Sequence, residues 1–315
     1  MINPNQILTM VHIGLIYMVL AVPLTLSYKT TKIINFVHIN FITYGAYMAV
    51  FLYSVIGLKN VFVAAVAAFL LGGMMAVIDN VFVFEPLRRR GANVVILMIA
   101  SLGLWIFYKY FLYSVVDAAS RVIKVNLVSQ LIRFENFPSL YVGGYVVKGS
   151  LLMTILFSFL LMGLLYIILQ KTAIGKAIRA ISDNPGLAEI SGIPRSKVLN
   201  FMWFLAGGIA SIGGMLWITY AIATPEVGDT LILQIFAIAV IGGLNSLLWT
   251  SVGAFIIAAA ETIGMALLNQ YFGVPTSFKP FITFSTLLTV IIAFPPLGAG
   301  GGLPYRFIKK RRGEK

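Results

Sequence analysis

Long apolar runs alternate with short polar segments along almost the whole of this chain. A helix that crosses the roughly 30 Å hydrocarbon core of a bilayer needs about 20 mostly apolar residues. Runs of this kind lie near residues 7–28, 33–56, 60–78, 93–116, 149–170, 199–221, 231–248, 251–269 and 281–297. The pattern predicts an all-α, polytopic transmembrane helix bundle of about 8–10 spans. We expect residues 1–315 to form one transmembrane domain.

Two of these runs are less regular than the others. The run at 33–56 begins with a stretch rich in Asn and His, and the run at 231–248 reaches Gly242 and Gly243 after few apolar residues. Non-helical backbone at membrane depth is tolerated where it is buried in protein or lines a water-filled cavity. We therefore expect one or two broken or re-entrant helices.

The composition supports a membrane protein and excludes several other classes. Hydrophobic residues make up 60% of the chain and charged residues 10%, which is too few to coat a soluble surface. The net charge of +13 arises from loops between apolar runs, so it does not predict nucleic-acid binding. The sequence has no cysteine, and its two histidines, His12 and His38, lie in different runs. We therefore predict no metal site.

The distribution of Lys and Arg predicts the orientation in the membrane. In an alternating scheme, one side carries Lys29, Lys32, Arg88, Arg89, Arg90, Lys171, Lys176, Arg179, Arg195, Lys197, Arg306, Lys309, Lys310, Arg311, Arg312 and Lys315. The other side carries Lys59, Arg121, Lys124, Arg133, Lys148 and Lys279. Because cytoplasmic loops are enriched in basic residues, we expect a multi-pass cell-membrane protein with its N-terminus outside and its C-terminus cytoplasmic. Lys109 is left inside a run, and we expect it to snorkel toward the outer end.

A polar segment at residues 171–198, here named the coupling segment, separates two apolar runs. Its first part, near 174–181, has the mixed polarity of an interfacial helix. Asp183-Asn184-Pro185-Gly186 is expected to end that helix, and a second short helix is expected to end at Gly192. We predict a helix-turn-helix knob that docks another protein. The alternative is an ordinary solvated loop, although most connections between helices are shorter.

Polar residues also cluster inside or beside the second run, at Asn35, His38, Asn40, Thr43 and Tyr44. Such side chains are unfavourable at membrane depth unless they face partners or a water-filled path. We interpret the cluster as a pathway-lining or helix-breaking element. The alternative is a position at the cytoplasmic interface, where lipid headgroups would solvate it.

One carboxylate, Glu261, lies within the eighth run among apolar residues. It could carry protons, pair with a cation, or hydrogen-bond across the bundle. We favour the structural role, because a single carboxylate does not form a proton relay. No arrangement of nucleophile, base and acid predicts an enzyme.

Four dispersed motifs resemble the branched-chain amino acid (Liv-type) family of ABC importer permeases over about residues 15–296. The coupling segment is similar to the family's coupling segment through Gly175-Lys176-Ala177-Ile178-Arg179-Ala180, Asp183-Asn184-Pro185, Ala188 and Gly192-Ile193. The other resemblances are Ile33-Ile34-Asn35-Phe36-Val37-His38 with Gly45-Ala46, Glu85-Pro86-Leu87-Arg88-Arg89, and Ala239-Val240-Ile241-Gly242-Gly243-Leu244 with Val252-Gly253-Ala254. Glu261 falls where the family commonly has a Glu. Asn245 and the Phe294-Pro295-Pro296-Leu297-Gly298 stretch depart from the family pattern, which leaves the substrate open.

The resemblance implies a permease subunit of an ATP-driven importer for branched-chain or other neutral amino acids. It implies a second related permease, two cytoplasmic ATPase subunits and an extracellular solute-binding protein as partners, with the lipid bilayer around them. The chain has no G-x-x-x-x-G-K-[ST] phosphate loop. We therefore expect it to bind no cofactor and to leave ATP hydrolysis to its partners.

The residue patterns and the resemblance together give two sets of candidate residues. The ATPase-coupling set is Gly175, Arg179, Asn184, Pro185, Ala188, Glu189, Gly192 and Ile193. The translocation-pathway set is Asn35, His38, Asn40, Thr43, Tyr44, Gly242, Gly243 and Glu261. The alternative function is a stand-alone secondary transporter or channel for a small polar solute such as an amide, urea or a nucleoside. Buried acidic pairs or a filter motif would favour that alternative, and the sequence has neither.

Overall fold

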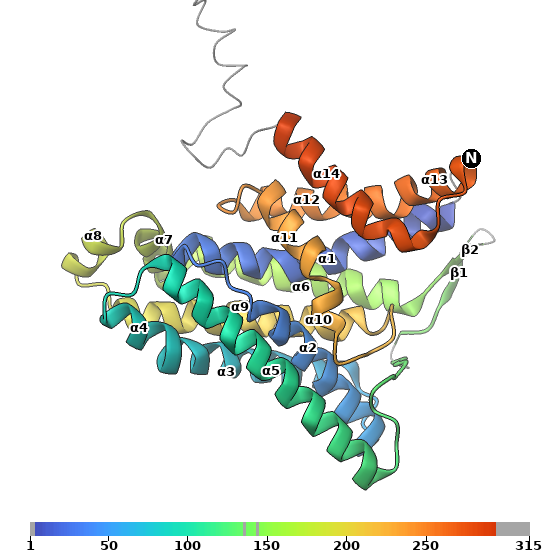
Figure 1. Cartoon of the computed structure of the whole chain (residues 1–315), viewed down its shortest axis with the longest axis horizontal. Coiled ribbons are helices and arrows are strands. Elements are labelled where there is room, and N and C mark those ends of the chain that lie inside the picture. The colour runs from blue at the N-terminus through green and yellow to red at the C-terminus, as the bar shows by residue number, and fades with distance from the viewer. Residues whose placement is uncertain (1–3, 135–136, 143–144, 294–315) are drawn as a thin grey trace, which may run out of the picture.

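Long helices run through the computed structural model, which describes residues 4–134, 137–142 and 145–293 (Figure 1). Eight of the described helices are long and apolar enough to cross a membrane. They confirm the prediction of an all-α, polytopic helix bundle. The last predicted run, at 281–297, extends beyond the described residues. The stretch at 294–298 and the basic residues of 306–315 lie wholly outside them.

The first four spans lie within the N-terminal 123 residues. They are α1 (Pro4–Thr31), α2 (His38–Val50) continued by the π-helix η1 (Phe51–Ile56), α3 (Val61–Asp79) continued by η2 (Asn80–Phe84) and α4 (Glu85–Arg89), and α5 (Val94–Ile123). Asn60 and Asn93 cap the N-termini of α3 and α5. The side chain of each accepts hydrogen bonds from backbone N–H groups of the first turn. These caps satisfy donors that a helix leaves unpaired at its N-terminus.

The remaining elements follow a short antiparallel hairpin of β1 (Leu140–Val142) and β2 (Tyr145–Val147). The further spans are α6 (Gly149–Lys171), α9 (Arg195–Trp217), α12 (Leu247–Ala259) continued by η3 (Ala260–Gly264) and α13 (Met265–Phe272), and η4 (Thr276–Phe278) with α14 (Lys279–Ala293). Between α6 and α9 lie α7 (Ala173–Asp183) and α8 (Pro185–Ile190). Between α9 and α12 lie α10 (Val227–Thr230) and α11 (Ile232–Ile241).

Both irregular runs of the sequence are interrupted in the structure. The second helix begins at His38, and the preceding residues 32–35 are non-helical although Ile33 and Asn35 are fully buried. The run at 231–248 holds only α11, whose 10 residues extend about 15 Å at 1.5 Å per residue. This is about half of the hydrocarbon core. The expectation of broken helices is therefore confirmed.

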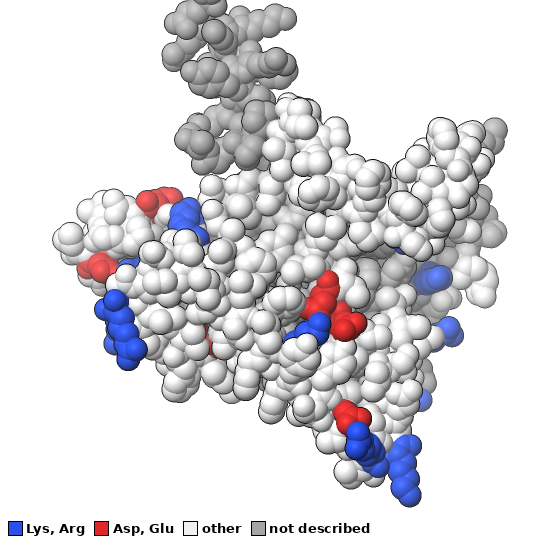
Figure 2. Space-filling view, in the orientation of Figure 1, with Lys and Arg blue, Asp and Glu red and all other residues white. Residues whose placement is uncertain are grey.

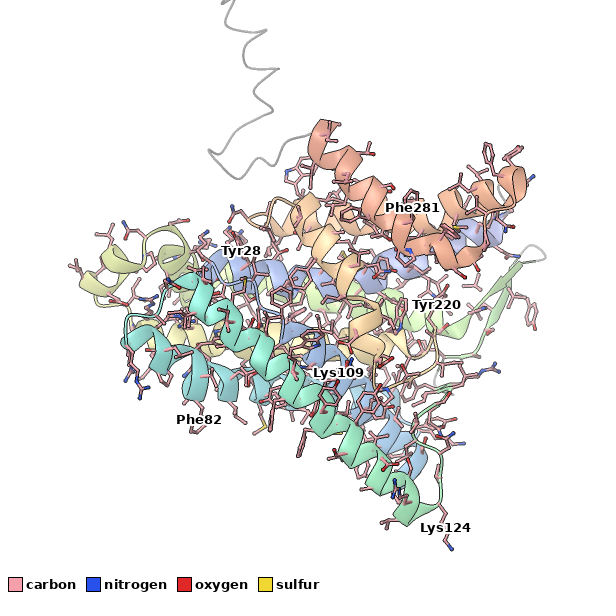
Figure 3. The ribbon with its side chains drawn as sticks, viewed as in Figure 1. Tyr28, Phe82, Lys109, Lys124, Tyr220 and Phe281 are labelled. Carbon is pink, nitrogen blue, oxygen red and sulfur yellow. The ribbon has the colours of Figure 1, made fainter. Side chains whose placement is uncertain are left out.

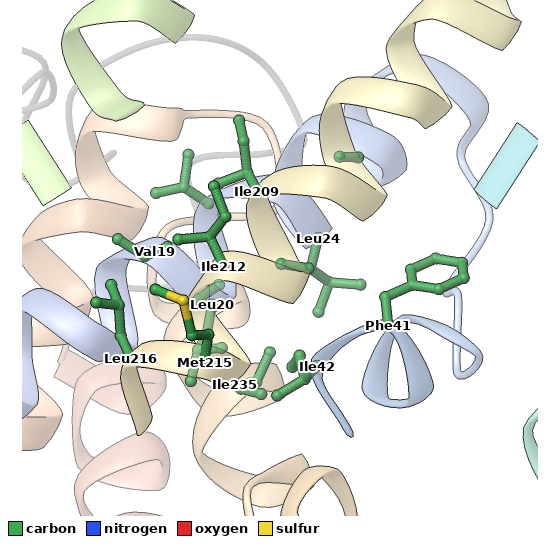
Figure 4. Close-up of a cluster of buried hydrophobic side chains, with 14 of the residues drawn as sticks. Val19, Leu20, Leu24, Phe41, Ile42, Ile209, Ile212, Met215, Leu216 and Ile235 are labelled. Carbon is green, nitrogen blue, oxygen red and sulfur yellow. The ribbon is translucent and has the colours of Figure 1, made fainter. Parts of the chain in front are cut away.

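Two spans, α1 and α9, form the centre of the bundle, with 72% and 83% of their most apolar stretches buried. Figure 4 shows the core where they meet α2 and α11, including Leu20, Ile42, Met215 and Ile235. The contact of α9 with α2 depends on small residues, because a Cβ atom on Gly214 would lie 1.9 Å from the carbonyl oxygen of Ile42. Close backbone approach of this kind allows dispersion contacts to hold helices together where lipid supplies no hydrophobic drive.

The loops gather at two ends of the bundle. At one end, α4, α7 and α8 lie together, and at the other lie the β hairpin and α13 (Figure 1). The Ser182 hydroxyl of α7 donates a hydrogen bond to Thr30 at the end of α1 over 3.3 Å. The Lys32 ammonium donates one to the Asn245 side chain, which follows α11, over 3.3 Å. We name this end the basic end, because Lys32, Arg88–Arg90 and the coupling segment are all there. The structure thus places on one end the described members of the larger basic group identified in the sequence.

Candidate coupling and transport sites

The coupling segment folds as two short helices, as its turn signals predict. Thr172 caps α7 by accepting a hydrogen bond from the Gly175 N–H over 3.1 Å. Asn184 caps α8 by accepting one from the Leu187 N–H over 3.0 Å, and Pro185 occupies the first helical position. Gly192 then ends α8 with a φ of 82°, a left-handed conformation that glycine adopts without strain. The segment is an ordered knob at the basic end (Figure 1).

The first helix of the knob is fixed to the end of α6. The Arg179 guanidinium donates to the Leu169 carbonyl oxygen and, over 3.0 Å, to the Gln170 side chain. A Cβ atom on Gly175 would lie 2.1 Å from the Ile168 carbonyl oxygen, so only glycine allows this approach. Ile178 and Ile181 are buried beneath the helix. These contacts attach α7 to the end of α6.

The second helix of the knob presents a different surface from the one expected. Ala188 is only 4% exposed, and its carbonyl oxygen accepts a hydrogen bond from the Ile193 N–H over 3.0 Å. Glu189 forms an ion pair with Arg195 at the start of α9 over 3.0 Å. The residues that project outward are Leu187 and Ile190, which are 62% and 87% exposed. Sequence reasoning missed both, although large apolar residues in a polar loop could have identified them.

The polar residues of the second run are buried between helices. The His38 ring nitrogen Nε2 lies 2.9 Å from the Leu20 carbonyl oxygen of α1. Asn40 donates to the Trp105 carbonyl oxygen of α5 over 2.9 Å, and Tyr44 donates to that of Tyr108 over 3.0 Å. These bonds join α2 to its neighbours. The alternative of a headgroup-solvated position does not fit, since His38 and Asn40 are at most 3% exposed.

Thr43 contacts the short helix α10, and Asn35 lies in the non-helical entry to α2. Thr43 accepts a hydrogen bond from the Gly228 N–H of α10 over 3.0 Å, so α10 lies beside the middle of α2. Asn35 precedes α2 and is fully buried, and neither its amide nitrogen nor its amide oxygen has a partner among the described residues.

The glycines of the candidate pathway lie at the basic end. A Cβ atom on Gly242 would lie 2.3 Å from the Thr250 hydroxyl oxygen, and Gly243 has a φ of 71°. They form the tight turn between α11 and α12, next to Asn245 and its contact with Lys32. This position is separate from the middle of α2, where Thr43 meets α10.

Glu261 lies in the π-helical segment η3 and is 4% exposed. The Tyr17 hydroxyl of α1 donates to it over 2.7 Å, and the Thr283 hydroxyl of α14 donates to its other oxygen. The carboxylate therefore joins three elements that are far apart in the sequence. Its contacts match the structural role favoured from the sequence.

Two features of the interior were missed in the sequence. Asp79, at the end of α3, is 1% exposed and accepts a hydrogen bond from the Tyr108 hydroxyl over 2.7 Å. Lys109 does not snorkel as expected, because its ammonium group lies 2.8 Å from the Asp229 carboxylate of α10. The Trp105 indole N–H donates to the same carboxylate over 2.8 Å. The polar residues just before α11 could have indicated that Lys109 has an acidic partner there.

A bundle of membrane-spanning helices, with buried polar contacts at interrupted helices and an ordered knob at one end, defines a multi-pass membrane transport subunit. The chain belongs to the family of branched-chain amino acid transport system permease components, whose family model matches residues 6–294.

Several permease proteins are similar to most of the chain. The probable branched-chain amino acid transport permease protein LivH of Methanocaldococcus jannaschii is 31% identical over 88% of this chain and 84% of its own length. The high-affinity permease protein BraD of Pseudomonas aeruginosa is 23% identical over 94% of this chain and 95% of its own. The corresponding LivH protein of Escherichia coli is 24% identical over 92% and 93%. No solved structure matches the chain.

Proposed function

We propose that this chain is the membrane-spanning permease subunit of an ATP-driven importer and that it moves branched-chain or other neutral amino acids. The observation that carries the proposal is the ordered knob at the basic end, which has exposed apolar residues on a chain that lacks a phosphate-binding loop. The energy of ATP would enter through this knob from separate subunits. The names of the similar permeases support branched-chain amino acids as the substrate class.

The proposed orientation places the basic end in the cytoplasm, following the bias of Lys and Arg toward cytoplasmic loops. Because α1 ends there at Thr31, its other end and the N-terminus would be outside. The basic C-terminal residues would lie inside. The knob would then face two cytoplasmic ATPase subunits, while the opposite end would receive the substrate from an extracellular solute-binding protein. A second related permease would complete the pair.

Movement of the knob would reach the spans through its fixed contacts. Arg179 and Gly175 hold α7 on α6, and the Glu189–Arg195 pair holds α8 on α9. The central position of α9 against α1, α2 and α3 would pass that movement to the interrupted helices. ATP-driven closure of the ATPases would thereby shift the bundle between outward and inward access, a change of population between two packings.

In this proposal the candidate coupling residues have different roles. Gly175 and Arg179 attach the knob, whereas Asn184, Pro185, Gly192 and Ile193 shape its two turns. Ala188 and Glu189 support α8 from within, and the neighbouring Leu187 and Ile190 make the contact with the ATPase.

The pathway residues would act at three places in the bundle. His38, Asn40, Thr43 and Tyr44 would set the position of α2 beside the route, and Asn35 would lie at the non-helical entry to α2. Gly242 and Gly243 would allow the α11–α12 turn to close at the basic end, and Glu261 would hold α1, η3 and α14 together.

Affinity purification from the native membrane tests the proposal. We expect an ATPase to co-purify with the tagged protein and to be lost with Ile190→Arg, because the charge would be placed in an apolar contact. Tyr141→Arg is the matched control, since Tyr141 is 82% exposed on β1 at the opposite end. It should retain the ATPase. No ATPase with the unaltered protein would refute the importer and would favour a stand-alone transporter or channel.

A further inference from the structure

Three charged side chains meet on the surface of the bundle at membrane depth. Lys109 of α5 lies 2.8 Å from Asp229 and 3.8 Å from Glu226. Figure 2 shows acidic and basic residues meeting near the middle of this face, over α5 and α10, while the other charged residues in the view lie toward its edges. The side chains are not sealed inside the protein, because those of Lys109, Asp229 and Glu226 are 22%, 20% and 53% exposed.

The depth of the cluster follows from the two elements that carry it. Along α5, Lys109 is about 24 Å from Asn93 and about 12 Å from Asp117, at 1.5 Å per residue. Figure 3 shows Lys109 midway along α5, with Lys124 at the far end. The hydrogen bond from Gly228 to Thr43 places α10 beside the middle of α2. Partly exposed charges at this depth are unfavourable against lipid, so this face contacts water or protein.

The residues around Lys109 continue the polar surface along α5. Trp105 and Tyr113 lie four residues before and after it, which puts all three on one stripe of the helix. The Trp105 indole donates to Asp229 over 2.8 Å, and Tyr113 lies one turn beyond Lys109 on the same stripe. The stripe and α10 form a surface with one cation and two carboxylates. By contrast, α6 has no charged residue between Gly149 and Gln170 and exposes Phe159 and Leu160.

We propose that this cluster lines a water-filled part of the substrate route and binds both charged groups of a zwitterionic amino acid. Glu226, the more exposed carboxylate, accepts hydrogen bonds from the substrate ammonium, and Lys109 donates to the substrate carboxylate. Asp229 and Trp105 hold the lysine side of the site in place. The ligand class rests on the proposed function, whereas the exposure of this face to water does not.

Single thiols test whether the face contacts water. The chain has no cysteine, so each variant chain carries one thiol, and its modification is measured on this subunit. Ile106 is 51% exposed, three residues before Lys109 on the same stripe, and Phe159 is 68% exposed on α6. Because the thiolate is the reactive species, a charged methanethiosulfonate should modify Ile106→Cys in the complete transporter and leave Phe159→Cys unmodified. Absence of reaction at Ile106→Cys, with normal reaction after denaturation, would overturn the water-lined route.

Uptake of labelled leucine by the complete transporter in liposomes tests the ligand. Loss of a hydrogen bond to a charged group predicts that Glu226→Gln raises the KM at least about tenfold. Asp117→Asn is the matched control, since Asp117 pairs with Arg121 at the exposed end of α5. The double variant Lys109→Gln with Asp229→Asn keeps the net charge, and a purely structural pair would therefore tolerate it. We expect it to lose uptake while still co-purifying with the ATPase.

The outcomes separate this inference from the proposed function. Normal uptake by the Glu226→Gln and double variants, alongside normal uptake by the unaltered transporter, would overturn the binding site and leave the proposed function standing. No uptake of leucine or another neutral amino acid by the unaltered transporter would overturn the proposed function and the ligand together. The thiol reaction would still decide whether the face of α5 and α10 contacts water.

Discussion

The contact between α9 and α2 predicts a large effect from a single methyl group. In Gly214→Ala, the added Cβ atom would lie 1.9 Å from the Ile42 carbonyl oxygen and 2.7 Å from the carbonyl carbon. The obstacle is backbone, so no side-chain rotation relieves it. Ser211, one turn earlier on α9, donates to the Phe41 carbonyl oxygen over 2.7 Å and holds the same two helices together. The two helices must therefore separate to accommodate the substitution.

The magnitude follows from that separation. Ordinary contact begins near 3.4 Å, so the local displacement is about 1.5 Å (3.4 − 1.9). Overpacking of this kind lowers the free energy of unfolding by about 1–3 kcal/mol. Alanine also favours the helix over glycine by about 0.8–1.0 kcal/mol. A matched control removes this second effect: Gly163 lies within α6, and a Cβ atom there would meet nothing within 4 Å.

Thermal unfolding of the purified protein in detergent measures the difference. We expect Gly214→Ala to have a Tm about 2–10 °C below that of Gly163→Ala, and Gly163→Ala to match or exceed the unaltered protein. Equal Tm values for the two variants would refute the argument, because they would show that α2 does not approach α9 as closely as the structure indicates.

Three other substitutions test separate contacts. Glu261→Leu removes the acceptor of the Tyr17 and Thr283 hydroxyls, and should lower the free energy of unfolding in detergent by about 1–3 kcal/mol; Glu261→Gln, which keeps one acceptor oxygen, should have a smaller effect. Asn184→Ala removes the cap of α8 and about 1 kcal/mol of local stability, so limited proteolysis should cleave the knob faster; unchanged cleavage would argue against the cap. Tyr108→Phe leaves the buried Asp79 carboxylate without its donor, and should lower the Tm, whereas Tyr110→Phe, at a 63% exposed residue, should not.

The spans could be predicted because their signal is local. A run of about 20 apolar residues fits a bilayer whatever surrounds it, and the structure confirms the helical class, the interrupted second helix and the short α11. The ends of α5 were less predictable. It continues to Ile123, and its last turns carry Asp117 and Arg121, which form an ion pair four residues apart on the exposed surface of the helix.

The sites were harder to predict from the sequence than the spans, because their contacts join distant parts of the chain. Lys109 pairs with an aspartate 120 residues later, and the pair is evident only once α10 is seen beside α2. In the coupling segment, the sequence predicts both helices, the turn between them and the end of the second helix at Gly192. It does not show which side of α8 packs toward α9, and for that reason Ala188 was expected to contact a partner while Ile190 was overlooked.

The non-helical entry to α2 limits the order in which the chain can assemble. The Phe36 N–H donates to the Ser101 hydroxyl over 3.2 Å, and that serine is synthesised 65 residues later. The Phe36 ring stacks on Phe236 of α11, which lies 200 residues after Phe36 in the chain. Unpaired backbone groups do not remain in lipid. The final contacts of this entry therefore cannot form until α5, and then α11, have been synthesised.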